Sequence, residues 1–457
     1  MNTAASQVEL DENDLMMIRA ASLAPRPRKI AETGLSESLL GDLIAKHLYG
    51  AGVLTIPALG QRTALAGPIV EDLLNYLRKD GQVEVRAQIA GENGLRYGLT
   101  ERGRESAQAA LLRSGYVGPA PVPLAFYSEV VRHQSVRDRR ITHERMHAKF
   151  SDVVISAGML DRLGPALNSG KAIFVYGDPG TGKSYVTQRL ARLLDDEALV
   201  PHAIAVGETI IEVFNPLVHM PLDVPSLGVM LDDGYDPRFV LCRRPVVLTG
   251  GELVPEMLEV QFEPATRQFR APLQLQASNG MFILDDLGRQ RVPPQTILNR
   301  WIVPMEEGRD YLSLPNGQHF PIQFDLLLVF STNLNPTELA DDAFLRRIGY
   351  KIRFEALSPD EYHEIWKQVC AQRNIVYDWT VCQRTIDRLH LPSGTALLPC
   401  HPRDLIGMAL DRSSYLGAAG ELCFESLQWA WNSYFLALTA RRPSTAADPH
   451  SETVSFP

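Results

Sequence analysis

Apolar runs alternate with helix-forming segments over the second half of the chain. The runs 172–176, 281–284 and 324–330 (AIFVY, MFIL and FDLLLVF) contain almost no polar residue, which is typical of strands buried on both faces of a parallel sheet. A helical pattern follows the first run over 185–194. The alternation of such strands with helices predicts an α/β fold with a parallel sheet.

A different pattern fills the region between residues 36 and 112. Three helical segments precede two strand-like segments around a turn-rich tip, and a last helix follows. Pro68 in the first turn and Gly81 at the end mark the bounds of the third helix. This order predicts a small α+β domain that resembles a winged helix. The helices are expected at 36–49, 55–65, 67–81 and 101–112, and the strands at 82–89 and 95–100, around a tip at 90–94.

The third of these helices has acidic residues, Glu71 and Asp72, at early exposed positions. In winged helices that bind DNA this helix faces the phosphates, which carboxylates repel. Acidic and basic side chains also balance over 36–115. The pattern therefore favours a role in protein binding or packing, and leaves DNA binding as the less favoured alternative.

Length and charge narrow the classes of function. The chain has 457 residues, enough for two or three domains, and its 45 Lys and Arg against 54 Asp and Glu give a net charge of −9. This balance gives no general attraction to nucleic acid or to anionic lipid. The first residues are acidic, unlike a signal peptide, and no apolar run approaches the length of a membrane span. We expect a cytoplasmic protein without membrane insertion.

Cysteine and histidine patterns do not predict a metal site. The five cysteines form no C-x-x-C pair, which fits a reducing compartment, and Cys400 beside His401 lacks a second ligand pair. The segment HERMH, 143–147, matches the H-E-x-x-H pattern of zinc proteases. Its neighbours are strongly charged, however, and no further ligand follows at a characteristic spacing. We interpret this segment as a solvated helix.

The segment GDPGTGKS, 177–184, follows the first apolar run and opens a helix. Its glycines allow successive backbone N–H groups to turn toward a phosphate. Lys183 supplies a charge for the β and γ oxygens, and Ser184 supplies a hydroxyl for Mg2+. The pattern predicts an ATP site. The residues expected to bind the nucleotide are Gly177, Asp178, Pro179, Gly180, Thr181, Gly182, Lys183, Ser184 and Tyr185.

Polar residues follow the later strands. Asp285 and Asp286 end the second apolar run, where carboxylates reach the same phosphates. Asn333 follows the third run, where an amide can orient an attacking water. Two neighbouring arginines precede a further strand, and another arginine opens a late helix. These arginines are Arg346, Arg347 and Arg403.

Together and in this order the motifs resemble those of AAA+ ATPases, over about residues 150–438. The resemblance implies a P-loop parallel sheet followed by a helical lid. It implies that Ser184 and Asp285 hold Mg2+ and that Asp286 is the catalytic Walker B carboxylate. The further roles that it implies are sensor 1 for Asn333, the arginine finger for Arg346 or Arg347, and sensor 2 for Arg403.

Two hairpin patterns refine the resemblance. The segment 309–330 has alternating strands around the turn PNGQ and resembles the pre-sensor-1 hairpin. The segment 259–273 is a candidate second hairpin that interrupts a helix, as in the superclade that holds MoxR-type ATPases, magnesium chelatase subunits and bacterial enhancer-binding proteins. By this resemblance such hairpins project toward substrate in a ring. The loop with which enhancer-binding proteins contact sigma factor is absent from the sequence.

These boundaries and the composition predict the domain organisation. The polar start and the Pro-rich segment YVGPAPVPLAFY are typical of mobile and semi-rigid connections. We expect a flexible leader at 1–34, the winged-helix-like domain at 35–115, a linker at 116–149, the AAA+ α/β nucleotide-binding domain at 150–354, the helical lid at 355–440 and a disordered tail at 441–457.

The resemblance implies an ATPase that converts ATP and water to ADP and phosphate and remodels or assembles a protein partner, as chaperone-like motors do. A finger acts across a subunit interface, so a homo-oligomeric ring, most often a hexamer, is also implied. The chain departs from the family at Asp286, which is one methylene shorter than the usual glutamate. An ATP-binding switch with very slow hydrolysis and a DNA-associated, ATP-dependent regulator remain alternatives.

Overall fold

The computed structural model describes residues 12–86, 94–223, 234–417 and 422–439. These residues form two compact units. The first unit contains the chain up to residue 151 together with 157–177 and 183–353, and the second contains 152–156, 178–182 and the chain from 354 onward. The predicted tail at 441–457, the first part of the predicted leader and most of the predicted tip at 90–94 lie outside the described residues.

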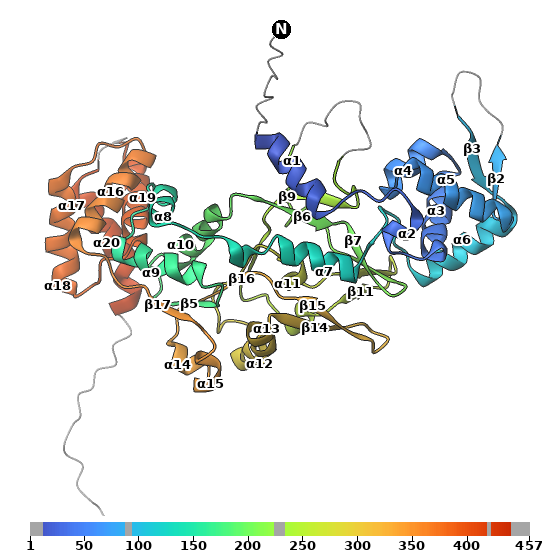
Figure 1. Ribbon diagram of the computed structural model, residues 1–457. Coiled ribbons are helices and arrows are strands. Elements are labelled where there is room, and N and C mark those ends of the chain that lie inside the picture. The colour runs from blue at the N-terminus through green and yellow to red at the C-terminus, as the bar shows by residue number, and fades with distance from the viewer. Residues whose placement is uncertain (1–11, 87–93, 224–233, 418–421, 440–457) are drawn as a thin grey trace, which may run out of the picture. The chain divides into compact units, whose positions relative to one another are not determined.

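The first unit is built on a five-stranded parallel sheet with the order β10–β13–β16–β5–β17. Strands β16, β5 and β17 of this sheet are labelled in Figure 1. The predicted α/β fold with a parallel sheet is therefore confirmed. Strand β5 comes first along the chain but lies between β16 and β17, so the strand order reverses beside it, which is where α/β sheets commonly bind ligands. The strands are β10 (Val246–Thr249), β13 (Met281–Leu284), β16 (Leu327–Thr332), β5 (Ile173–Tyr176) and β17 (Tyr350–Arg353).

One face of this sheet is covered by a core rich in aromatic side chains. Phe174, Phe282 and Phe330 alternate with residues of the other face, and they pack with Trp301 and Phe344. The helices around the sheet are α9 (Ala157–Asn168), α10 (Lys183–Leu190), α11 (Leu273–Gln276), α12 (Pro294–Arg300), α13 (Ile302–Glu307), α14 (Pro336–Leu339) and α15 (Asp342–Leu345).

The N-terminal part contains the predicted helices and strand pair, together with a short strand, β1, that the sequence pattern did not predict. The three strands form an antiparallel sheet with the order β1–β3–β2. Glu71 and Asp72 lie exposed on α5, as expected. The elements are α3 (Glu37–Ala51), β1 (Val53–Thr55), α4 (Ile56–Thr63), α5 (Gly67–Lys79), β2 (Val83–Arg86), β3 (Arg96–Leu99) and α6 (Glu101–Arg113).

A second sheet, in the first unit, joins this N-terminal part to the part that contains the parallel sheet. Its order is β11–β12–β8–β7–β4, and Ala203, Ala205 and Ile210 from β7 and β8 belong to the same hydrophobic core as α3, α5 and β3. The strands are β4 (Val122–Pro123), β7 (Ala203–Val206), β8 (Thr209–Glu212), β11 (Gln261–Glu263) and β12 (Gln268–Arg270), and a separate antiparallel pair consists of β6 (Glu197–Pro201) and β9 (Phe239–Arg243).

The expectations of a flexible leader at 1–34 and a linker at 116–149 differ from the structure. Residues 12–34 contain α1 (Glu12–Leu23) and α2 (Ile30–Thr33), and Ala20 and Ala24 are buried against β6 and β9. The segment 116–149 contains β4, α7 (Leu124–His133), η1 (Val136–Asp138) and α8 (His143–Lys149). The composition of both segments suggests that they are not ordered. They are ordered in the structure because strands that are distant in the sequence supply their packing and pairing partners.

A buried arginine fixes both segments. Arg238 forms an ion pair with Asp236 through Nη2 at 2.8 Å. Its Nη1 donates to the carbonyl oxygens of Thr33 at 3.0 Å and Pro121 at 3.2 Å. Both charged side chains are at most 1% exposed. One guanidinium group thus links the end of the leader, the entry to β4 and the start of β9.

Replacement of this arginine is expected to destabilise the first unit strongly. Arg238→Ala leaves the Asp236 carboxylate buried and unpaired, so the free energy of unfolding should fall by about 3–5 kcal/mol. Urea unfolding followed by circular dichroism measures the loss. The control is Arg113→Ala, which removes an exposed ion pair with Asp42 and should cost less than about 1 kcal/mol. Equal losses for the two variants would contradict the role given to Arg238.

The two predicted hairpins are both present. Strands β14 (Arg309–Ser313) and β15 (His319–Gln323) pair antiparallel, as do β11 and β12. The β11–β12 hairpin does not project freely, however, because β12 pairs with β8 and the carbonyl oxygen of Arg267, at the hairpin turn, accepts from the Gly115 N–H at 2.9 Å. A Cβ at Gly115 would lie 1.7 Å from the Thr266 oxygen, so only glycine fits there.

The second unit is helical around one core. Its first helix, α16, begins with a capping box in which Ser358 and Glu361 satisfy each other's backbone N–H groups, after which Pro359 occupies the first turn. Tyr362 and Trp366 are fully buried at the centre of the core. The helices are α16 (Pro359–Gln372), α17 (Trp379–Thr385), the π-helical turn η4 (Ile386–His390), α18 (Leu391–Ser393), α19 (Cys400–Tyr415) and α20 (Phe424–Thr439).

None of the described helices of either unit is both long and apolar enough to cross a membrane.

Candidate nucleotide site

The glycine-rich loop leaves the carboxyl end of β5 and leads into α10. Gly180 and Gly182 have φ angles of 84° and 86°, in the left-handed region that favours glycine. The Lys183 side chain is buried and its Nζ donates to the Gly177 carbonyl oxygen at 2.9 Å. Thr181 donates from its hydroxyl to the Asp178 carbonyl oxygen at 2.8 Å. The loop is thus held in a tight turn by its own backbone and side chains.

In the second unit, the loop residues 178–182 pack against the start of α19. A Cβ at Gly180 would lie 2.6 Å from the Cys400 sulfur, and one at Gly182 would lie 3.6 Å from Pro399. Because the Gly180 contact is too close for any Cβ, a side chain at this position would displace either the loop or α19. Gly180 is therefore needed for both its φ angle and its size.

Asp285 and Asp286 follow β13 directly, as predicted. The Asp285 N–H donates to the Thr249 carbonyl oxygen of β10 at 2.8 Å, and the Asp285 carboxylate accepts from the Asp286 N–H at 2.9 Å. Asp286 has a φ angle of 49°. Aspartate and asparagine adopt this left-handed conformation more readily than other residues with side chains. The backbone therefore turns sharply between the two carboxylates.

Asn333 lies beside Asp286. Its amide donates from Nδ2 to Oδ1 of Asp286 at 3.1 Å. Backbone and side-chain bonds hold the two chain segments together, since the Leu287 N–H donates to the Ser331 carbonyl oxygen at 2.9 Å and the Thr332 hydroxyl donates to the Leu287 carbonyl oxygen at 2.6 Å. The structure thus brings together a carboxylate and an amide that are 47 residues apart.

The strand register puts these groups at the same edge of the sheet as Gly177, where the glycine-rich loop begins. Tyr176, the last residue of β5, is level with Thr332 in β16, and Leu284 is level with Phe330. Strands β5, β13 and β16 are neighbours or next neighbours and run parallel. Their carboxyl ends therefore lie together, and each is followed by the polar residues that the sequence singled out.

Two residues of this edge were not predicted. Gln290 accepts from the Gly288 N–H at 2.8 Å and donates to the Gly250 and Asp286 carbonyl oxygens at 3.0 and 3.3 Å. Arg289 lies 3.9 Å from the Asp286 carboxylate. The run DDLGRQ contains both residues, but nothing in the sequence shows that the chain folds back on itself after Asp286. The glutamine fixes the shape of the turn that carries Asp286.

The two candidate finger arginines have different environments. Arg347 forms an ion pair with Glu306 at 2.5 Å. Arg346, one residue earlier, is exposed and forms no ion pair with the residues that the structure describes. Both follow α15, which is capped by Asp341 accepting from the Phe344 N–H at 2.8 Å. The first arginine is thus available to another molecule, and the second is engaged within its own chain.

Arg403 lies in the first turn of α19, in the second unit, and its side chain is 70% exposed. Its Nε donates to the Asp404 carboxylate at 2.9 Å, and this hydrogen bond raises the pKa of Arg403. Asp404 also accepts from the Tyr434 hydroxyl at 3.2 Å. Burial raises the pKa of the neighbouring Cys400 thiol, so this cysteine is held as a neutral thiol.

Two buried histidines, His390 and His401, contact each other in the same helical unit, with ring centroids 5.4 Å apart. Burial lowers the pKa of His390 and of His401 to about 4. Nδ1 of His390 faces the Thr395 carbonyl oxygen at 3.2 Å and must donate to it, so Nε2 accepts from the Tyr362 hydroxyl at 2.9 Å. Both rings are at most 3% exposed. The second unit therefore requires both histidines to be neutral.

The second unit should consequently lose stability in acid. An unfolded histidine has a pKa near 6.5, so the unfolded chain binds more protons than the folded one between about pH 6.5 and 4, and each histidine contributes up to about 3 kcal/mol that is lost over this window. Four of the five tryptophans lie in this unit, so tryptophan fluorescence during urea unfolding reports it. His401→Gln should flatten the pH dependence, whereas His319→Gln, at an exposed position of β15, should not. A transition that is independent of pH would contradict this prediction.

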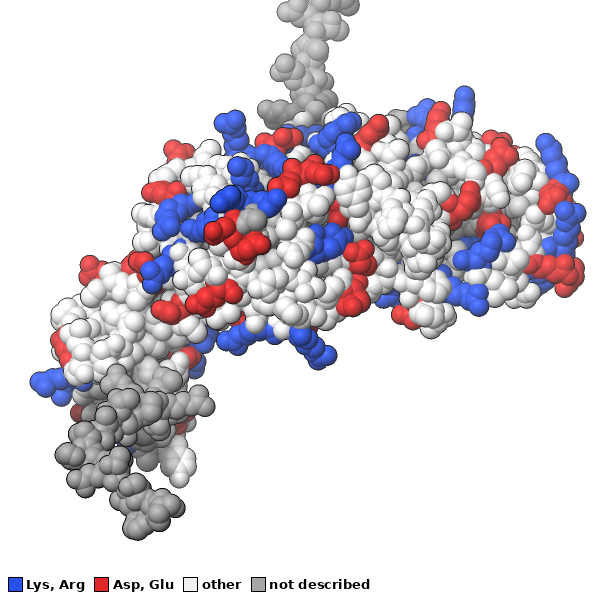
Figure 2. All heavy atoms as spheres, turned by 90° about the horizontal axis from the view of Figure 1, so that it is seen from below, with Lys and Arg blue, Asp and Glu red and all other residues white. Residues whose placement is uncertain are grey.

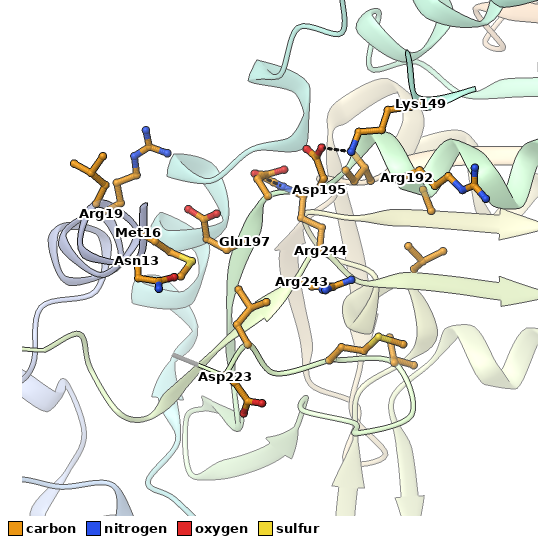
Figure 3. A pocket seen from close by; sticks show the side chains of 18 of the residues that line it. Asn13, Met16, Arg19, Lys149, Arg192, Asp195, Glu197, Asp223, Arg243 and Arg244 are labelled. Atoms are coloured by element: carbon orange, nitrogen blue, oxygen red, sulfur yellow. Dashed lines mark hydrogen bonds and ion pairs between the residues drawn. The ribbon is translucent and has the colours of Figure 1, made fainter. Parts of the chain in front are cut away.

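A cavity that is separate from these residues lies elsewhere in the first unit. It has a volume of about 940 Å3 and is lined by α1, by the segment after α10 and by the region around β9, with basic and acidic side chains around it (Figure 3). Lys149 lies against Asp195 in this view, at 2.8 Å. None of the residues predicted to bind nucleotide lines it.

Comparison with known proteins adds little to these features. A family model described as "Domain of unknown function (DUF8689)" matches residues 358–433. Among curated proteins, no sequence matches the chain. Solved structures of RuvB from Thermotoga maritima resemble it at low similarity. One, described as a Holliday junction branch migration motor, is 14% identical with a TM-score of 0.34 and covers 66% of this chain and 73% of its own. Two RuvB mutants are 13% identical, with TM-scores of 0.33 and 0.36, and cover 65% of this chain and 72% and 70% of theirs.

Proposed function

We propose that the chain is an AAA+ ATPase that uses Mg2+ and ATP to remodel or assemble a protein partner. The observation that carries this proposal is the edge of the parallel sheet, where the glycine-rich loop after β5, the two carboxylates after β13 and Asn333 after β16 occur together. A phosphate-binding loop, a pair of carboxylates and an amide are the groups that phosphoryl transfer to water requires. The resemblance of the motifs in their order supports the same family.

Each group has a defined role in this proposal. The loop N–H groups and Lys183 hold the phosphates, and the charge of Lys183 offsets that of the γ-phosphate. Ser184 and Asp285 offer hard oxygen ligands, which suit Mg2+, and the ion would neutralise phosphate charge. Asp286 accepts a hydrogen bond from the attacking water, and Asn333 fixes the orientation of that carboxylate. The energy of the reaction is then available for mechanical work on a partner.

We further propose that the active form is a homo-oligomeric ring. Arg346 is exposed, and the structure gives it no ion pair within the described residues, which leaves its guanidinium available for a contact with the γ-phosphate of the next subunit. Arg403 would act as sensor 2 from the lid. A DNA-associated regulator is the second candidate, because α3, β1, α4, α5, β2, β3 and α6 follow the order of a winged helix.

The surface favours a protein partner over DNA. Glu71 and Asp72 are exposed on the helix that would face phosphates, and acidic and basic side chains are interspersed over the described part of the face in Figure 2. Electrophoretic mobility shifts of a duplex, measured against salt, distinguish the two candidates. Tight binding that weakens steeply with salt would favour the DNA-associated regulator.

The assignment of the loop is tested by removing its charge. Lys183→Ala should weaken ATP binding about 100-fold or more, because charge-assisted hydrogen bonds to two phosphates are lost, at about 1.5–3 kcal/mol each. Isothermal titration with ATP and Mg2+ measures the affinity, and circular dichroism verifies the fold. The control is Lys367→Ala, which removes an exposed lysine of α16. If Lys183→Ala binds ATP as the wild type does, the assignment of the loop is wrong.

A further inference from the structure

Two histidines and an aspartate of the first unit meet in the structure, although they were not predicted as a site. His143 and His147 are four residues apart on α8, so their side chains lie on one face of the helix. Asp161, on α9, faces them. Its Oδ1 lies 3.4 Å from Nε2 of His143 and 3.7 Å from Nε2 of His147. The ligand that the sequence pattern lacks is therefore supplied 14 residues after His147.

The two histidine–aspartate distances are close to those between ligands of one metal ion. At metal–ligand bond lengths near 2.0–2.1 Å, tetrahedral geometry places neighbouring ligand atoms about 3.3 Å apart. One donor atom from each of the three residues lies within 4.8 Å of the other two. The two histidine–aspartate distances are too long for good hydrogen bonds, yet they come within a few tenths of an ångström of the tetrahedral value.

A buried polar atom points to the same conclusion. Nε2 of His147 is shielded from solvent and has no hydrogen-bond partner among the residues that the structure describes. A buried nitrogen without a partner is costly, and a bound cation would use its lone pair. Asp161 and His143 remain exposed on the outer side, with exposed fractions of 52% and 70%, so an ion can enter from solvent.

The surroundings hold the three ligands in place. Asn168, at the end of α9, exchanges two hydrogen bonds with the backbone of Ile141, at 2.7 and 2.9 Å. Thr142 caps α8 by accepting from the Arg145 N–H at 3.2 Å. Helices α8 and α9 are thus fixed to each other without an ion, and binding would require little reorganisation.

We propose that His143, His147 and Asp161 bind one divalent transition-metal ion, with Zn2+ as the expected ion and water as the fourth ligand. Two imidazoles and one carboxylate suit Zn2+ and its neighbours in the first row, whereas Mg2+ prefers oxygen ligands only. The ion would tie α8 to α9, and no hydrolytic step is assigned to it. The site is independent of the proposed ATPase.

The test is metal binding by the full chain without an affinity tag, after chelator treatment and without nucleotide. Titration with Zn2+, and with Co2+ followed by visible absorption, should show one site that millimolar Mg2+ does not occupy. His147→Gln and Asp161→Asn should each weaken Co2+ binding about 100-fold or more, since even loss of a residue that only supports a ligand costs about 10–100-fold. His133→Gln, an exposed histidine of α7, should bind as the wild type does.

Two results would overturn the proposal. One is the absence of Zn2+ binding by the wild type at micromolar concentrations. The other is binding that survives in both His147→Gln and Asp161→Asn, or that shows thiolate absorption and is lost in Cys423→Ser, because the exposed Cys423 would then be the ligand.

Discussion

Asp286→Asn should lower the rate of ATP hydrolysis about 100- to 10,000-fold while leaving the affinity for ATP unchanged. The carboxylate would be lost as an acceptor for the attacking water. Asparagine retains the oxygen that accepts from Asn333 and tolerates the φ angle of 49°, so the local structure should be preserved. Phosphate release with Mg2+ and saturating ATP measures the rate, and titration measures the affinity.

Three related variants sharpen this experiment. Asp285→Asn should instead weaken Mg2+ binding, because the structure gives the two carboxylates different partners. Arg289→Ala, at an exposed side chain 3.9 Å from Asp286, should change the rate little. Asp286→Glu restores the usual reach and should turn over at least as fast as the wild type if reach limits the rate. The left-handed backbone opposes this gain, at a cost of about 1 kcal/mol.

One outcome would favour the ATP-binding switch instead. If the wild type and Asp286→Asn release phosphate at the same rate, no faster than Lys183→Ala, then hydrolysis is not the function of the site. The measurement has to be made at a protein concentration high enough for the proposed ring to assemble. Otherwise the absence of a finger from the neighbouring subunit would produce the same result.

Arg346→Ala should lower the rate of hydrolysis about 1,000-fold while ATP affinity is retained, because an arginine finger acts on charge that develops in the transition state. Arg347→Ala is the matched control. Its guanidinium is engaged by Glu306, and a partly exposed ion pair of this kind contributes about 0–1 kcal/mol to stability, so the variant should hydrolyse ATP at nearly the wild-type rate.

A mixing experiment tests whether Arg346 acts across an interface. Arg346→Ala retains an intact phosphate site, and Lys183→Ala retains an intact finger. Mixed rings would therefore contain interfaces in which both parts are present, and activity should partly return. If activity is lost in Arg347→Ala and retained in Arg346→Ala, the assignment of the two arginines is reversed. If mixing restores nothing, the finger does not act between subunits.

The sequence predicts those features that short segments determine. The glycine-rich loop, the apolar strand before it and the carboxylates after β13 are local patterns, and the structure has each where the pattern placed it. The α/β class follows in the same way from runs such as 281–284, which are typical of strands buried on both faces. Helix α16 likewise begins where Ser358, Pro359 and Glu361 indicate.

Features that depend on distant partners could not be predicted. Proline-rich composition suggested a linker at 116–149. In the structure, however, Val122 pairs with Ile204, and Arg238 donates to the carbonyl oxygens of Thr33 and Pro121. The same holds for Asp161, whose relation to the histidines of α8 depends on how two helices pack. It also holds for Arg346 and Arg347. The sequence does not distinguish these two arginines, whereas in the structure Arg347 forms an ion pair with Glu306.

The shared core of the N-terminal elements with β7 and β8 has a consequence for protein engineering. Residues 1–115 cannot serve as an interchangeable cassette, because removal would expose Ala203, Ala205 and Ile210 and would strip the partner from the hairpin turn at Arg267. A chimera that exchanges the N-terminal elements has to transfer the strands β4, β7 and β8 with them. Grafts that end at residue 115 are expected to aggregate, whereas surface substitutions on α5 should be tolerated.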